Sequence, residues 1–140
     1  QADFMAALAD PRLRAVVICP SNPYLSIDPM LALPGVREAL TACPAPVVAV
    51  SPIIGGRAVK GPTAKMMREL GLPVTAAAVA RHYAGLIDLY VVDTSEDEVS
   101  LPNVRTAKAA ILMTTLADRE ALAKSVLAVA DAFRKEVRRR

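Results

Sequence analysis

The chain of 140 residues contains no tryptophan, one histidine and two cysteines, and aromatic residues make up only 4% of it. One histidine with Cys19 and Cys43 is too few ligands for an ordinary zinc site, and two cysteines in apolar contexts do not indicate a disulfide framework. The longest apolar runs, such as AVVIC at 15–19, are far below the roughly 18 residues that span a bilayer, and no secretory signal is visible. The composition therefore predicts a cytoplasmic protein with no membrane partner.

The chain also lacks a basic face, although its formal net charge is +3. Residues 134–140 form a basic tail with a net charge of +4, so residues 1–133 carry −1. Arginines at the end of a helix are favoured by the helix dipole and are usually solvated. With so few aromatic rings there is also no platform on which bases could stack. Nucleic acid is therefore not expected as a partner.

The two best-known phosphate motifs are absent as well. No G-x-G-x-x-G occurs, and Gly56 and Gly61 have the spacing of a Walker A loop, but Pro62 stands where the lysine belongs. What is present is the segment 46–65, PVVAVSPIIGGRAVKGPTAK, which predicts a buried strand, a glycine loop and the start of a helix. In an α/β protein this order is typical of a phosphate site.

The candidate residues of this segment are Ser51, Gly55, Gly56, Lys60, Gly61 and Lys65. The paired glycines allow positive φ and a close approach of the main chain to a ligand. Pro62 suits the first helical position, so the N–H groups that follow would face an anion between two lysines. The alternative is a plain glycine turn with solvated lysines.

A second loop, CPSNPYLSIDP, follows the strand predicted at 15–19 and offers the polar side chains of Ser21 and Asn22. Ser26 or Ile27 is the expected cap of the next helix, before Asp28. Ligands of open α/β sheets bind beyond the carboxyl ends of the strands, so both loops are expected on one rim. Turn chemistry alone is the alternative for this loop too.

The remaining pattern alternates strands and helices. Helices are predicted at 2–9, 29–42 (interrupted at Pro34), 62–70 (ended by Gly71), 75–84 and 116–137; strands are predicted at 15–19, 46–50, 86–92 and, with a helix as the alternative, 104–112. This order predicts a single Rossmann-like three-layer α/β domain over 1–140 with a mainly parallel sheet, here a partial domain.

Three further features carry candidate chemistry. Asp93 ends a predicted strand and is a candidate Mg²⁺ ligand, with a turn or cap role as the alternative. The acidic run 96–98 is predicted to be a solvated loop. His82 is a candidate general base, since histidine is the side chain most often used for that role, but its place near a helix end favours a packed or capping residue.

The strings SNPYLSIDPML, SPIIGGRAVKGPTAKMMRELG and VARHYAGLIDLYVVD resemble the C-terminal half of the 2-phospho-L-lactate transferase family, from Ala15 to about Phe133. The resemblance implies an enzyme of deazaflavin coenzyme F-420 biosynthesis. Such an enzyme transfers a phospholactyl or phosphoenolpyruvyl group from a GDP-linked donor to the deazaflavin alcohol, releasing GMP with Mg²⁺. A homo-oligomer is also expected.

The resemblance covers only about half of a family enzyme, and the family's N-terminal glycine loop has no counterpart in this sequence. The chain is therefore expected to hold part of a site, to be inactive alone, and to self-associate. Two other functions stay open: a non-catalytic regulator that binds a nucleotide sugar, and an assembly module that pairs subunits.

Overall fold

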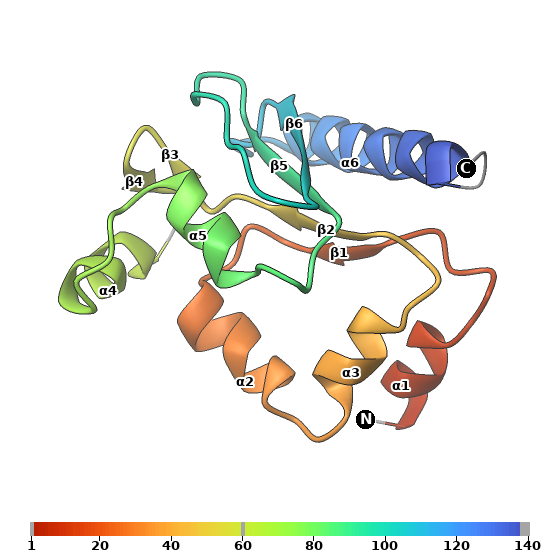
Figure 1. The fold of residues 1–140 in the computed structure, drawn as a ribbon. Helices are drawn as coiled ribbons and strands as arrows, with labels where there is room; N and C mark the ends of the chain where they lie inside the picture. The colour runs from red at the N-terminus through yellow and green to blue at the C-terminus, as the bar shows by residue number, and fades with distance from the viewer. Residues whose placement is uncertain (1, 60, 138–140) are drawn as a thin grey trace.

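A computed structural model describes residues 2–59 and 61–137 of the chain. Its centre is a sheet of four parallel strands in the order β1-β2-β5-β6: β1 (Val16–Ile18), β2 (Val47–Val50), β5 (Leu89–Asp93) and β6 (Arg105–Ala109) (Figure 1). Val17 pairs with Val48 across β1 and β2, and Val48 pairs with Leu89 of β5. Because all four strands run the same way, their carboxyl ends meet at one edge.

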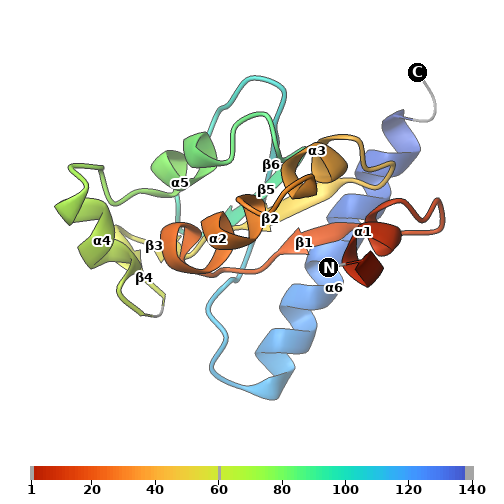
Figure 2. The ribbon, with the colours of Figure 1, turned by 90° about the horizontal axis from the view of Figure 1, so that it is seen from below.

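Helices cover both faces of the sheet, which gives the three layers of a Rossmann-like fold (Figures 1 and 2). The long helix α6 (Leu116–Val137) lies on one face, and α1 (Ala2–Leu8), α2 (Asp28–Leu31), α3 (Val36–Thr41) and α5 (Ala76–His82) lie on the other. A π-helical turn, η1 (Pro23–Ile27), leads into α2, and α4 (Thr63–Glu69) stands beyond the end of the sheet. The α/β prediction is confirmed. No helix among the described residues has the length and apolar character needed to cross a membrane.

The side chains of the two central strands alternate between the two layers. Val47, Ala49, Tyr90 and Val92 pack in the cluster beneath α3 and α5, whereas Val48, Val50, Leu89 and Val91 pack against α6. All of β2 and β5 is buried, as expected for parallel strands covered on both faces. The residues of α6 that pack against the sheet are Leu122, Val126 and Ala130, which are spaced so that they lie on one face of the helix.

Most predicted elements form within a few residues of their expected ends. The helix expected at 29–42 is interrupted beside Pro34, and Gly35 with φ of 78° starts α3. Gly71, with φ of 68°, follows the end of α4. In the ambiguous segment 104–112, residues Arg105–Ala109 form a strand because they pair with β5. The antiparallel hairpin of β3 (Ile53–Ile54) and β4 (Arg57–Ala58) was not predicted.

Among the described residues, strand β1 is paired only with β2, so its other side forms an open edge of the sheet. Val17 is 39% exposed although it lies in the strand. Apolar cavities of about 390 and 230 Å³ flank β1 on the two faces of the sheet. An unpaired strand between apolar surfaces is a template for association.

We therefore expect the 140-residue chain, prepared alone, to exceed the monomer mass in sedimentation velocity. Val17→Lys should shift the distribution towards monomer, since a lysine on an edge strand opposes pairing. Leu70→Lys is the matched control, because Leu70, the C-cap residue of α4, is 56% exposed and lies outside β1. A monomeric wild type, or equal effects of the two substitutions, would contradict association through β1.

Candidate functional site

The loops that follow β1 and β2 lie side by side at the carboxyl edge of the sheet, as the parallel pairing of these strands requires. Asn22 connects them: its side-chain amide donates to the sulfur of Met66 in α4 at 3.4 Å. Its carbonyl oxygen accepts from the N–H groups of Tyr24 and Leu25 at 3.0 and 3.1 Å, and so caps η1. The structure thus brings the Asn22 loop against the helix that follows the glycine loop.

The side chain that caps this helical segment is Asn22, whereas Ser26 or Ile27 was expected. Ile27 does stand at the N-cap position of α2, but neither it nor Ser26 provides a side-chain cap there. The helical path begins earlier, at Pro23, because the Asn22 side chain satisfies the first free N–H groups. Ser21 precedes this cap, and its N–H donates to the Cys19 carbonyl at 2.6 Å.

Gly55 and Gly56 form the two-residue loop of the β3–β4 hairpin. Their φ angles are 54° and 72°, and positive φ at both positions is what a type I′ hairpin turn requires. A Cβ added at Gly55 would meet nothing within 4 Å, and one at Gly56 would lie 3.7 Å from the Val74 carbonyl oxygen. The glycines are therefore required for the backbone conformation of the turn, and the space that a Cβ of Gly55 would fill is open.

Ser51 holds the backbone at the start of this hairpin. It is fully buried, and its hydroxyl both donates to the Ile53 carbonyl at 3.0 Å and accepts from the Ile53 N–H at 3.1 Å. Its own N–H donates to the Val91 carbonyl at 2.8 Å, which extends the pairing of β2 with β5. Ser51 thus anchors the base of the hairpin, and its side chain does not face the rim.

The second half of the predicted phosphate segment is the start of α4, where Gly61 and Pro62 are exposed and Thr63 is buried. Lys60 lies outside the described residues. Gly61 adopts φ of 68°, and Pro62 is the N-cap residue of α4 rather than its first helical residue. Lys65 is exposed on α4 and lies 3.8 Å from the Glu69 carboxylate.

Asp93, at the end of β5, uses its carboxylate within the fold. One oxygen accepts from the N–H and hydroxyl of Ser95 at 3.0 and 2.6 Å, and the other accepts from the Ile111 N–H at 3.2 Å. The Ser95 hydroxyl is the main cause of a lowered pKa for Asp93, with the backbone N–H groups adding to it against the effect of burial. This geometry matches the turn alternative. Within the described residues, no three His, Cys, Asp or Glu side chains come together as a metal site.

The acidic run 96–98 is not simply solvated, and the expectation is wrong for Glu96. Its carboxylate accepts a hydrogen bond from the Gly55 N–H at 2.5 Å, and Lys108 of β6 donates to its carbonyl at 2.6 Å. The loop after β5 therefore reaches the glycine hairpin, and Lys108 of β6 contacts that loop. Sequence reasoning missed Glu96 and Lys108 because neither belongs to a motif. Their only signal was their position near the carboxyl ends of two strands.

His82 packs as expected and lies away from the glycine hairpin along α5. Its Nε2 is 2.8 Å from an oxygen of Asp28, and its ring makes edge contacts with Tyr24 and Tyr83 at centroid distances of 4.9 and 5.5 Å. These contacts join α5 to η1 and α2. Burial raises the pKa of Tyr83, with the Asp28 charge adding to the shift. The cluster therefore has a packing role between helices.

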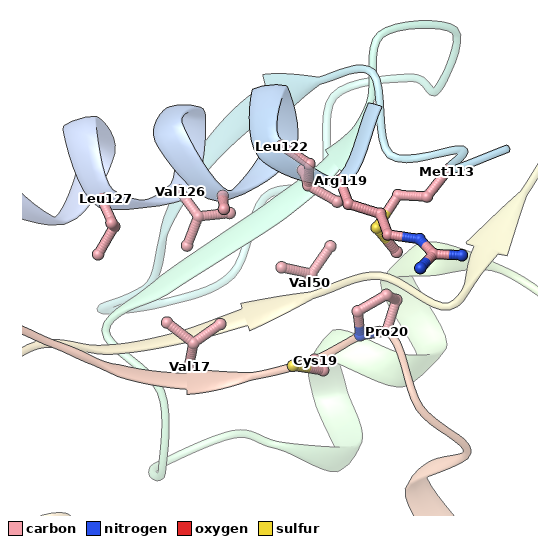
Figure 3. Close-up of a pocket in the computed structure, with 10 residues that line it drawn as sticks. Val17, Cys19, Pro20, Val50, Met113, Arg119, Leu122, Val126 and Leu127 are labelled. Atoms are coloured by element: carbon pink, nitrogen blue, oxygen red, sulfur yellow. The ribbon is translucent and has the colours of Figure 1, made fainter. Parts of the chain in front are cut away.

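The larger cavity beside β1 is not a phosphate site. It has a volume of about 390 Å³ and lies between α6 and the strands β1 and β2 (Figure 3). Its lining is apolar except for Arg119 at one end, and the free thiol of Cys19 lies on the opposite wall (Figure 3). An apolar cavity of this kind suits a packing partner better than an anion.

Comparison with known proteins identifies the family. The sequence profile of 2-phospho-L-lactate transferase CofD matches residues 3–132, and the chain belongs to this family. A phosphoenolpyruvate transferase of Streptomyces griseus is 40% identical over 124 residues, which cover 85% of this chain and 39% of the relative. A 2-phospho-L-lactate transferase of Methanosarcina acetivorans is 40% identical over 120 residues, covering 83% of this chain and 38% of the relative.

The resemblance seen in the sequence is thereby confirmed. The chain spans about two fifths of the length of these relatives. The names of these relatives state the group that each of them transfers.

Proposed function

We propose that the complete protein is a transferase that moves a phospholactyl or phosphoenolpyruvyl group from a GDP-linked donor to a deazaflavin alcohol, releasing GMP. This chain would contribute part of the donor phosphate site. The observation that supports the proposal best is the family match over residues 3–132, which includes both loops of the carboxyl rim. The matching relatives include phosphoenolpyruvate transferases and 2-phospho-L-lactate transferases, so the proposal includes both transferred groups.

In this proposal the glycine hairpin and the Asn22 loop hold the donor diphosphate. The space that a Cβ of Gly55 would fill is open, and phosphate oxygens would take the Gly55 N–H in place of the Glu96 carboxylate that accepts from it. Asn22 keeps the neighbouring loop and α4 in fixed positions through its contacts with Tyr24 and Met66. Phosphoryl transfer depends chiefly on positioning and charge neutralisation, and the residues of this rim would provide the positioning.

We propose Mg²⁺ as the cofactor on the strength of the family resemblance. When bound, it would neutralise charge on the diphosphate. The described residues offer no cluster of ligands for it, and both oxygens of Asp93 already accept hydrogen bonds. We therefore assign it no ligand in this chain.

The test is a titration of the complete protein with GDP and with the deazaflavin alcohol by calorimetry. The transferase proposal requires binding of both. Binding of a uridine-type nucleotide sugar instead would favour the regulator, and binding of none would favour the assembly module. The transferase names of the relatives give neither alternative support.

We expect the double substitution Lys60→Ala and Lys65→Ala to weaken donor binding by about tenfold at low salt, because each lysine adds positive charge near the diphosphate. The measurement is the Kd of GDP in the complete protein. Lys124→Ala on the exposed side of α6 removes one of the same kind of charge away from the glycine hairpin and should leave the Kd unchanged. Equal affinity of the double variant and the wild type would mean that both lysines are only solvated.

A further inference from the structure

The N–H of Gly55 already has an anionic partner, which is the side chain of Glu96. The distance from the Gly55 nitrogen to the Glu96 carboxylate oxygen is 2.5 Å, and the two residues are 41 positions apart in the sequence. The bond therefore joins the hairpin after β2 to the loop after β5. A carboxylate oxygen on a backbone N–H is the same charge-assisted chemistry as a phosphate oxygen in that position.

The backbone of Glu96 forms two hydrogen bonds, whereas its carboxylate forms one. Its N–H donates to the Asp93 carbonyl at 3.1 Å, and its own carbonyl accepts from the Lys108 ammonium at 2.6 Å. Among the described residues the carboxylate forms no salt bridge and no hydrogen bond besides that to Gly55. Rotation of the side chain would thus release Gly55 without opening the turn that carries Glu96.

We propose that Glu96 is a built-in competitor for the anion of the donor, and that it determines how tightly the glycine hairpin binds a phosphate group. The inference rests on the proposed function, since it concerns the same rim. Before a phosphate oxygen takes the Gly55 N–H, the carboxylate must leave it. The apparent affinity is therefore lowered by the fraction of molecules in which Gly55 is free.

The test is calorimetric titration of the complete protein with inorganic pyrophosphate. Glu96→Ala should bind pyrophosphate about tenfold more tightly than the wild type, as expected if Gly55 is free in about a tenth of the molecules. Glu96→Gln should lie between them, since a neutral amide oxygen accepts roughly half as strongly as a carboxylate. The matched controls are Asp97→Ala and Glu98→Ala, which remove the same charge from exposed positions in the same loop and should change affinity less than about twofold.

A second readout does not depend on binding. The backbone amide resonance of Gly55 should shift in Glu96→Ala without ligand, and should stay in place in Glu98→Ala. Unchanged or weaker pyrophosphate binding by Glu96→Ala would overturn the inference alone, and so would equal tightening by the two controls. Absence of pyrophosphate binding in the wild type and in every variant would overturn both the inference and the proposed phosphate site.

Discussion

Replacing Asp93 with alanine is expected to lower the free energy of unfolding by about 3 kcal/mol, because the buried Ile111 N–H and the Ser95 turn would lose a charged acceptor. The carboxylate holds the Ser95 turn with one oxygen and the Ile111 N–H with the other, so it joins the end of β5 to the segment after β6. Urea denaturation at neutral pH measures the loss. Asp97→Ala is the matched control, because Asp97 is an exposed carboxylate in the same loop and should change stability by less than about 0.5 kcal/mol.

The same carboxylate predicts a pH dependence. The pKa of Asp93 is lowered in the fold from its usual 3.8, chiefly by the Ser95 hydroxyl. A group with a lowered pKa contributes its stability above the unfolded-state pKa and loses it as the pH falls through the folded-state pKa. The stability difference between wild type and Asp93→Asn should therefore be largest at neutral pH and shrink below about pH 4. A difference that stays constant down to pH 2 would mean that the charge of Asp93 does not contribute.

The layered fold could be predicted because its signals are local. Strand 46–50 is an uninterrupted apolar run, and the spacing of Leu122, Val126 and Ala130 indicates one face of a long helix. Pro34 and Gly71 marked a helix interruption and a helix end for stereochemical reasons. The sequence of segment 104–112 is compatible with a strand or a helix, and it is the pairing with β5 that makes residues 105–109 a strand.

The site was predictable only in outline. The rule that ligands bind at the carboxyl ends of parallel strands placed the Asn22 loop and the glycine loop together, and the structure agrees. The sequence could not show that Ser51 faces inward, since a serine after a strand is compatible with either orientation. Nor could it show that Glu96 reaches Gly55, because a contact over 41 residues depends on how two loops fold over the rim.

Replacing Gly55 or Gly56 with alanine is expected to reduce donor affinity by about 10–100-fold, because the added Cβ would stand in the path of the phosphate and break one charge-assisted hydrogen bond. The stability cost should be only about 1–2 kcal/mol, the penalty of a left-handed alanine, because an added Cβ meets no protein atom closer than 3.7 Å. Binding should therefore suffer more than folding. The measurements are the Kd of GDP and the urea midpoint of the complete protein.

Gly85 provides the matched control for these variants. It has φ of 76°, an added Cβ would meet nothing within 4 Å, and it precedes β5 at the opposite end of the sheet. Gly85→Ala should therefore lose the same stability as Gly55→Ala and bind GDP with unchanged affinity. If all three variants lose equal stability and keep wild-type affinity, Gly55 and Gly56 are turn residues of the hairpin, and the donor phosphate binds elsewhere on the rim.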